Sequence, residues 1–225
     1  MNARTPPSRT RIKICGLRTI EQVDAAVAAG ADAIGFVLYP PSIRAVDLAL
    51  LRRLTERVPA MVSTVALFVN PTGNEVLATL EAARIDLIQF HGSAEKESET
   101  FCGSFGRPYM KAFAVDDGFN LLESVNQYTS ANALLLDTPS AGHGGSGKTF
   151  NWQLINTQNM PSAHAPALVL SGGLTPANVG DAISVVKPFA VDVSSGVEIS
   201  RGEKSIELIH QFCHAVRAAD SQNAT

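Results

Sequence analysis

The stretch F-A-V-D-V-S-S-G-V-E, residues 189–198, carries a short apolar run to an aspartate, with two serines and a glycine close behind. Such a strand end points several backbone N–H groups at one spot, where an anion fits. Two other glycine-rich breaks, G-G-S-G-K at 144–148 and S-G-G at 171–173, also follow strand-like runs. Three such breaks after consecutive strands indicate a phosphate site at one end of a barrel.

Outward from this stretch, the chain alternates short apolar runs with longer amphipathic runs. The apolar runs predict strands at 11–15, 33–38, 62–69, 86–90, 108–114, 133–136, 167–170 and 189–193. The amphipathic runs predict helices starting at Thr19, Asp47 and Thr175, and covering 74–83, 95–102, 118–127 and 204–218, with a short helical piece at 151–156. A capping box at Thr19 and Gln22 and a cap at Asp47 mark two of the helix starts.

Strands that alternate with helices form a parallel sheet. The alternative to a barrel is an open, doubly wound sheet. Eight regularly spaced units that fill the chain favour a single-domain α/β fold, the (β/α)8 or TIM barrel. We expect a flexible leader at 1–10, the barrel at 11–219 and a frayed tail at 220–225.

Composition narrows the class of protein. The chain has 225 residues, of which 45% are hydrophobic, enough for one sizeable core. Its net charge of −3 gives no basic excess for nucleic acid or an anionic membrane. No apolar stretch approaches a membrane span, and residues 1–10 lack the apolar middle of a signal peptide. Three scattered cysteines argue against a disulfide framework and a zinc site, so we expect a cytoplasmic protein without a metal.

In a barrel of this kind the working groups lie at the carboxyl ends of the strands. Cys15 ends the first strand, where a thiol would face the barrel mouth, although core packing is an equal alternative. Asp137 follows three leucines, so it is not a solvated surface charge; it could also be a helix cap or a loop anchor. Together, Cys15 and Asp137 are a plausible acid and base on opposite sides of the mouth.

Other polar residues gather at the same strand ends. Arg44, in an otherwise apolar or small loop, could clamp a carboxylate or simply be a solvated arginine. Gln89 and His91 share one face of the fourth strand end. The loop with Gly144, Gly145, Gly147 and Lys148 lacks the spacing of a nucleotide-binding P-loop. It is either a flexible glycine loop or a mobile loop over the site.

The ordered set of motifs closely resembles the phosphoribosylanthranilate isomerase family of tryptophan biosynthesis. The matching stretches are K-I-C-G at 13–16, G-A-D-A-I-G-F-V at 30–37, P-P-S-I-R at 40–44, F-V-N at 68–70, Q-F-H-G at 89–92, L-L-L-D-T at 134–138, G-G-S-G-K-T-F-N-W at 144–152, L-S-G-G-L-T-P-A-N-V at 170–179 and 189–198 itself. No single motif is decisive, but their order is highly specific.

The resemblance implies an Amadori rearrangement of N-(5-phosphoribosyl)anthranilate to 1-(2-carboxyphenylamino)-1-deoxyribulose 5-phosphate, without metal or organic cofactor. By motif, Cys15 is similar to the family's general base and Asp137 to its general acid. Arg44 resembles the residue that holds the anthranilate carboxylate. Residues matching the phosphate-binding breaks are Gly172, Gly173, Ser195 and Gly196. Gln89, His91 and Asp192 match other positions around the substrate.

Two alternatives stay open at this point: another phosphosugar barrel isomerase or epimerase, and a non-catalytic phosphosugar-binding protein. The expected partner is a small phosphorylated substrate, and the chain could be a monomer or a homodimer.

Overall fold

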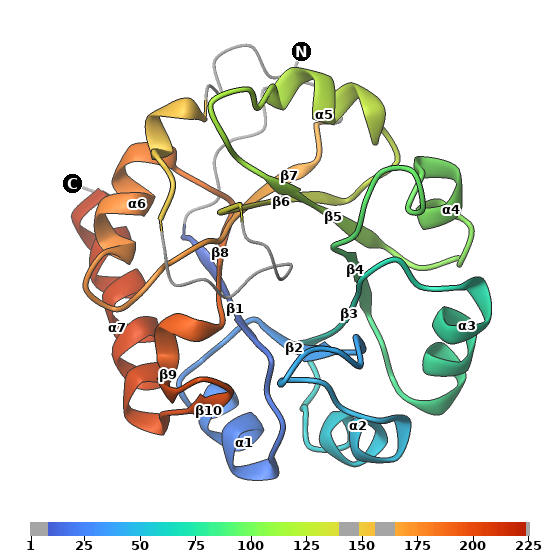
Figure 1. Cartoon of the computed structure of the whole chain (residues 1–225). Coiled ribbons are helices and arrows are strands. Elements are labelled where there is room, and N and C mark those ends of the chain that lie inside the picture. The colour runs from blue at the N-terminus through green and yellow to red at the C-terminus, as the bar shows by residue number, and fades with distance from the viewer. Residues whose placement is uncertain (1–8, 140–148, 156–164, 224–225) are drawn as a thin grey trace.

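The protein folds around a closed barrel of eight parallel strands, and the last strand pairs with the first. The computed structural model describes residues 9–139, 149–155 and 165–223. Figure 1 looks along the barrel and shows the strands as an inner ring with the helices outside it. The predicted (β/α)8 barrel is therefore confirmed, and the open sheet is excluded.

The strands fall where the apolar runs predict them, with ends that differ by at most one residue. They are β1 (Arg11–Cys15), β2 (Ala33–Val37), β3 (Ser63–Phe68), β4 (Leu87–Phe90), β5 (Tyr109–Ala114), β6 (Ala133–Asp137), β7 (Ala167–Leu170) and β8 (Ala190–Val193). Strands of a parallel barrel are covered by helices outside and by packed side chains inside, which explains their continuous apolar sequence.

The helices follow the strands in turn. They are α1 (Ile20–Ala28), α2 (Leu48–Thr55), α3 (Gly73–Ala82), α4 (Glu99–Gly103), α5 (Leu121–Gln127), α6 (Val179–Val186) and α7 (Ile206–Asn223), with short 3-10 helices η1 (Trp152–Leu154) and η2 (Ser195–Val197). Thr19 and Asp47 cap α1 and α2 as predicted. The reciprocal bond of the capping box is displaced, because the Gln22 side chain accepts from the Arg18 N–H instead.

Helices α4, α5 and α6 begin three or four residues later than the sequence pattern predicts. At α4, Glu97 turns its carboxylate inward to accept the N–H groups of Asn70 and Gly92, so Ser98 becomes the cap. At α5, Asn120 takes the cap. Before α6, residues 175–178 form a separate turn in which the Asn178 side chain accepts from the Thr175 N–H.

Residues near the carboxyl end correct two further predictions. Residues 198–204 form an antiparallel hairpin, β9 (Glu198–Ser200) and β10 (Glu203–Lys204), so α7 starts at Ile206 rather than at Lys204. Helix α7 continues to Asn223, past the predicted start of a frayed tail. Its Asp220 side chain accepts the N–H and hydroxyl of Thr10, which is buried. The predicted boundaries at residues 10 and 220 therefore both lie within packed structure.

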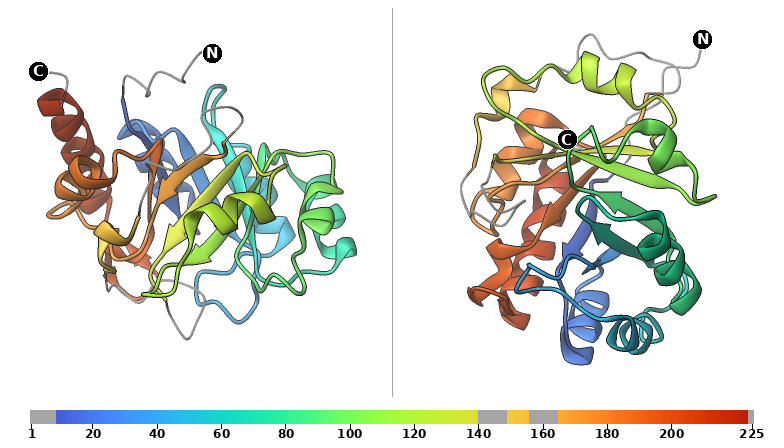
Figure 2. Two further views of the ribbon diagram at one scale, coloured as in Figure 1. Left: turned by 90° about the horizontal axis from the view of Figure 1, so that it is seen from above. Right: turned by 45° about the vertical axis from the view of Figure 1, so that its right-hand side comes forward.

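The hydrophobic core of the described residues has three clusters. The largest lies between the strands and the surrounding helices, and a smaller one, which includes Val65, Met110 and Leu135, fills the barrel. The third is made of Cys15, Val37, Leu67 and Val69. Because side chains fill the barrel interior, the barrel is not an open pore. The carboxyl ends of the strands form the floor of an open mouth at one end of it. Figure 2 shows the helices wrapping the barrel in two further views.

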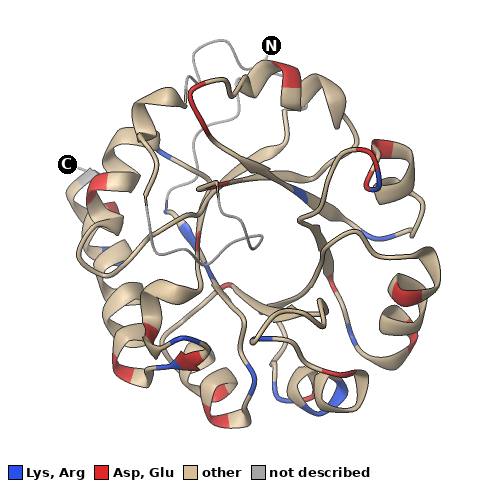
Figure 3. Cartoon of the chain, in the orientation of Figure 1, with Lys and Arg blue, Asp and Glu red and all other residues tan. Residues whose placement is uncertain are grey.

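Charged residues lie mostly on the outer helices and loops, with a few on the strands (Figure 3). In the part of the chain that the structure describes, no helix combines the length and hydropathy that a membrane crossing needs.

Candidate active site

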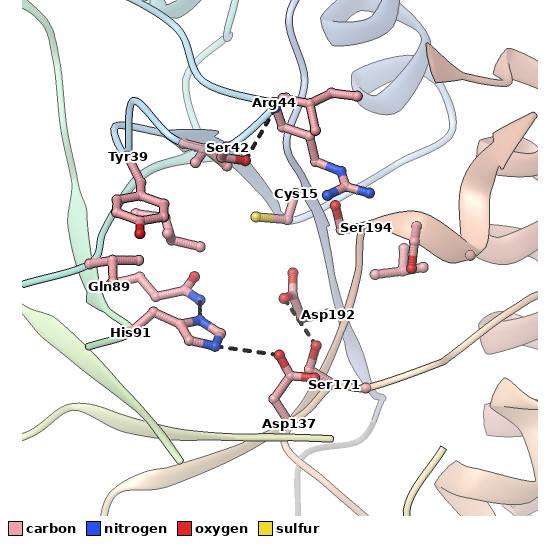
Figure 4. Close-up of a pocket in the computed structure, with 18 of the residues that line it drawn as sticks. Cys15, Tyr39, Ser42, Arg44, Gln89, His91, Asp137, Ser171, Asp192 and Ser194 are labelled. Atoms are coloured by element: carbon pink, nitrogen blue, oxygen red, sulfur yellow. Dashed lines mark hydrogen bonds and ion pairs between the residues drawn. The ribbon is translucent and has the colours of Figure 1, made fainter. Parts of the chain in front are cut away.

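A pocket of about 290 Å³ opens at the carboxyl ends of the barrel strands. Figure 4 shows Cys15 and Arg44 near one another on one side of it and Asp137 on the other. The pocket also brings together the remaining site predictions that lie in the described residues: Gln89, His91, Gly172, Gly173, Asp192, Ser195 and Gly196. The predicted mobile loop, with Gly144, Gly145, Gly147 and Lys148, lies outside the described residues.

Cys15 is the last residue of β1, and its thiol lines the pocket. Gly16 follows with φ of +78° and donates its N–H to the Gly35 carbonyl, which ends the strand in a sharp turn. A Cβ at Gly16 would lie 2.8 Å from Cδ of Arg44, so glycine leaves space for that side chain beside the thiol. Burial raises the pKa of the Cys15 thiol, and Lys13 opposes this effect.

Asp137 ends β6 and faces the pocket from the opposite side of the barrel mouth. One carboxylate oxygen accepts the Thr138 N–H at 2.7 Å, and the other lies 3.5 Å from Nε2 of His91. Burial raises the pKa of Asp137 to about 6, which outweighs the bond from Thr138. A carboxyl group with this pKa can hold a proton near neutral pH and give it to a substrate.

The raised pKa predicts a pH-dependent stability difference. The folded protein binds the Asp137 proton more tightly than the unfolded chain does, so its ionisation destabilises the fold as pH rises from about 4 to about 6. At pH 8, Asp137→Asn should raise the free energy of unfolding by about 2 kcal/mol, and at pH 4 it should have little effect. Urea unfolding at both pH values tests this, and an equal effect at both would contradict it.

Arg44 sits in the loop after β2, where Val37 and Ala45 form an isolated bridge and the Arg44 N–H donates to the Ser42 hydroxyl. Its guanidinium group makes a bidentate ion pair with Glu198, with Nε and Nη2 each 2.7 Å from a carboxylate oxygen. Although burial alone would raise the pKa of Glu198, Arg44 and Lys204 lower it to about 2. Arg44 is therefore held in one orientation at the pocket edge rather than solvated.

Two glycine turns shape the edge of the pocket after β7 and β8. Gly172 and Gly173 have φ of +84° and +65°, and a Cβ at Gly172 would lie 2.5 Å from the Thr138 nitrogen. A Cβ at Gly196 would overlap the Leu174 carbonyl oxygen. Both turns require glycine, and their short backbone is suited to a close approach by an anion.

Gln89 and His91 lie together on the β4 side of the pocket (Figure 4). Nε2 of Gln89 is 3.4 Å from Nδ1 of His91. Oε1 of Gln89 is buried and has no hydrogen-bond partner among the described residues. A buried acceptor of this kind is costly unless a ligand satisfies it.

Asp192 lies at the pocket floor, where the sequence predicted a substrate contact. Its carboxylate accepts from the Lys13 ammonium at 2.8 Å and from the Ser171 hydroxyl at 3.4 Å. Much of its hydrogen-bonding capacity is thus used within the protein, and its nearest cation is Lys13.

Sequence reasoning assigned no role to Lys13, Glu198 or Lys204. Glu198 closes the opening motif, and Lys13 precedes Cys15 by two residues, so strand alternation could have placed Lys13 on the same face as the thiol. Lys204 donates to Glu198 and to the carbonyl and hydroxyl of Ser194. These contacts of Lys204 depend on the β9–β10 hairpin, which the sequence did not predict.

The pocket is lined by a carboxyl group, a thiol and a guanidinium group, those of Asp137, Cys15 and Arg44. Within residues 9–139, 149–155 and 165–223, no group of three or more His, Cys, Asp or Glu side chains is arranged to hold a metal ion. A thiol and a carboxyl group face each other across the barrel mouth, with a guanidinium and glycine turns at its edges. An acid and a thiol that face one pocket at the strand ends of a (β/α)8 barrel suit an isomerase that moves protons on an anionic substrate.

Comparison with known proteins gives the particular family. The family model of N-(5'-phosphoribosyl)anthranilate isomerase matches residues 12–215. The isomerase of that name from Leptothrix cholodnii is 51% identical over 217 residues, which cover 96% of this chain and 95% of the relative. The one from Methylibium petroleiphilum is 49% identical, over 96% of this chain and 98% of the relative.

Solved structures agree. The phosphoribosyl anthranilate isomerase of Thermotoga maritima superimposes with a TM-score of 0.83 at 38% identity, covering 93% of this chain and 99% of that one. A phosphoribosyl anthranilate isomerase in complex with reduced 1-(o-carboxyphenylamino)-1-deoxyribulose 5-phosphate gives 0.80 at 35% identity, with the same coverage. This chain belongs to the N-(5'-phosphoribosyl)anthranilate isomerase family.

Proposed function

We propose that this chain catalyses the Amadori rearrangement of N-(5'-phosphoribosyl)anthranilate to 1-(2-carboxyphenylamino)-1-deoxyribulose 5-phosphate, a step of tryptophan biosynthesis. The observation that carries the proposal is the pairing of the Cys15 thiol and the Asp137 carboxyl group across one pocket. The reaction needs a base at one substrate atom and an acid at another, and these two groups lie on opposite sides of the mouth.

The first step assigned to the protein is ring opening. Protonated Asp137 gives its proton to the furanose ring oxygen, the bond from that oxygen to C1 breaks, and a Schiff base forms. The pKa of about 6 supports this role, because burial keeps a proton on the carboxyl group more readily than in water.

The second step is proton removal from C2 of the sugar. The Cys15 sulfur takes this proton, and the Schiff base becomes an enolamine. Transfer of a proton from the 2-hydroxyl group to C1 then gives the ketone. The proton added at the ring oxygen and the one taken from C2 balance, so the overall change is an isomerisation.

The remaining groups hold the substrate between these two residues. We assign the phosphate to the turns of Gly172, Gly173, Ser195 and Gly196, and the anthranilate carboxylate to Arg44. Oε1 of Gln89, which lacks a partner among the described residues, is suited to accept a sugar hydroxyl. His91 is placed to orient Asp137, and Asp192 completes the floor.

Replacing Arg44 by alanine should chiefly raise KM. A charge-assisted hydrogen bond contributes about 1.5–3 kcal/mol, equivalent to roughly a 10- to 100-fold change, and a carboxylate that takes no part in the bond changes is bound alike in ground and transition states. Glu198 keeps Lys204 as a partner in this variant. Steady-state kinetics should show KM raised with kcat nearly kept, and an exposed arginine variant, Arg53→Ala, should match the wild type. An unchanged KM in Arg44→Ala would contradict the carboxylate assignment.

Complementation tests the function in cells. The gene should restore growth without tryptophan to a strain that lacks this isomerase, and the Cys15→Ser and Asp137→Asn variants should not. Failure of the wild-type gene, when the protein accumulates in folded form, would contradict the proposal. We also propose that the protein works in the cytoplasm, because a free thiol that acts as a base needs a reducing compartment.

A further inference from the structure

Lys13 is a buried cation on the same strand as Cys15. Residues two apart on a strand point to the same face, and Lys13 and Cys15 both face the barrel interior. The register of β1 and β8 sets Lys13 directly opposite Asp192. The Lys13 ammonium lies 2.8 Å from the Asp192 carboxylate, and the two side chains are only 5% and 6% exposed.

The same ammonium group also lies beside the Cys15 sulfur. Gly35 of β2 is the register partner of Cys15. A Cβ added at Gly35 would be 2.8 Å from Sγ of Cys15 and 3.0 Å from Nζ of Lys13. Sulfur and ammonium therefore share the small space that glycine leaves above β2, and a side chain at position 35 would displace one of them.

The charges that face the thiol come from several elements. Lys13 of β1 and Asp192 of β8 are the close neighbours of the thiol. Lys204 of β10 and Arg44 of the β2 loop are the other cations that interact electrostatically with it. Asp137 of β6 and His91 after β4 line the same pocket. Burial is the main cause that raises the pKa of the thiol, and Lys13 is the main cause that lowers it.

We propose that Lys13 is a positioning residue of the site: its ammonium group stabilises Cys15 as a thiolate, and Asp192 limits how much of that charge the sulfur receives. A thiolate buried without a counterion is strongly disfavoured, so the base needs a cation close by. Asp192 holds the ammonium in place and competes with the sulfur for it. The inference rests on the proposed role of Cys15 as the base.

The pH dependence of Cys15 alkylation by iodoacetamide tests this role without substrate. Mass spectrometry of the Cys15 peptide gives the rate at each pH, with Cys102 and Cys213, which are buried in the core, as internal references. In Lys13→Met the midpoint of the alkylation curve should rise by about one to three pH units, because the cation is lost and Asp192 remains. In Asp192→Asn the midpoint should fall, because the Lys13 ammonium group then interacts with the sulfur without competition from a carboxylate.

The double variant Lys13→Met/Asp192→Asn keeps the test valid if the single lysine variant fails to fold, since it leaves no unpaired buried charge. Its midpoint should lie between those of the wild type and Lys13→Met. A surface control, Lys187→Met, should match the wild type. Unchanged midpoints, or shifts of the same sign in Lys13→Met and Asp192→Asn, would overturn the proposal.

This result is separable from the proposed function. Alkylation reports the charge of the sulfur in the free protein, whereas turnover by Cys15→Ser reports whether that sulfur is the base. Normal turnover in Cys15→Ser with the expected alkylation shifts would reject the catalytic role alone.

Discussion

Cys15→Ser should lower kcat by about 10²–10⁴-fold, the contribution of a positioned acid or base. A serine hydroxyl occupies nearly the same space at the end of β1, so the pocket should keep its shape. Its pKa is far above that of a thiol, however, and at neutral pH the hydroxyl is a much poorer acceptor for the C2 proton. Steady-state turnover of phosphoribosylanthranilate measures the loss.

A matched cysteine variant separates chemistry from stability. Cys213 is 1% exposed on α7, in the core between helices and sheet, and it does not line the pocket. Cys213→Ala should keep kcat while changing one buried thiol, and circular dichroism should show both variants folded. Near-normal kcat in Cys15→Ser would refute the assignment of the base.

Asp137→Asn should reduce kcat by a similar factor of about 10²–10⁴. The amide can still accept the Thr138 N–H that orients the side chain, but it has no proton of the right acidity for the furanose ring oxygen. Without that proton the ring opens slowly and the substrate for Cys15 does not form. The same turnover assay applies.

Asp117→Asn provides the control for this variant, because Asp117 is an exposed carboxylate in the loop after β5. It should retain wild-type kcat. If Asp137→Asn also retained it, the acid would have to be another group of the pocket. Because acid and base act in one sequence, the double variant Cys15→Ser/Asp137→Asn should lose less than the product of the two single losses.

The barrel was predictable because its signal is local and repeated. Each strand is a short apolar run of its own, and the eight runs recur at regular spacing, so small errors at the ends do not change the count. Two of the helix starts that were missed, at α4 and α6, depend on side chains that turn back to the loops, as Glu97 and Asn178 do. Propensity alone does not reveal those bonds.

The sequence did not reveal which side chains bind the site residues. The sequence left Arg44 as either a carboxylate clamp or a solvated loop arginine, and it did not reveal that the guanidinium group binds Glu198, 154 positions away. Lys13 and Asp192 are 179 positions apart and meet only because the barrel closes between β1 and β8. Pairings of this kind are set by register and closure, which a single sequence does not encode locally.

The motifs could indicate which side chains face the barrel mouth. Cys15, Asp137 and the glycine turns all fall at strand ends, and a barrel brings all strand ends to one side. The structure adds how these groups are held: Arg44 in one orientation by Glu198, and Cys15 beside a buried ammonium group. Residues 189–198 contribute to both arrangements: Glu198 holds the arginine, and Asp192 pairs with the buried ammonium group.

The proposed reaction is tested most simply by the loss of phosphoribosylanthranilate fluorescence on addition of the purified protein. We expect rapid, enzyme-dependent loss with the wild-type protein, with the ketose phosphate as product and no requirement for added metal or cofactor. We expect almost no loss with Cys15→Ser/Asp137→Asn. Wild-type protein that binds the substrate without converting it, or a double variant that converts it at the wild-type rate, would contradict the proposed isomerase activity.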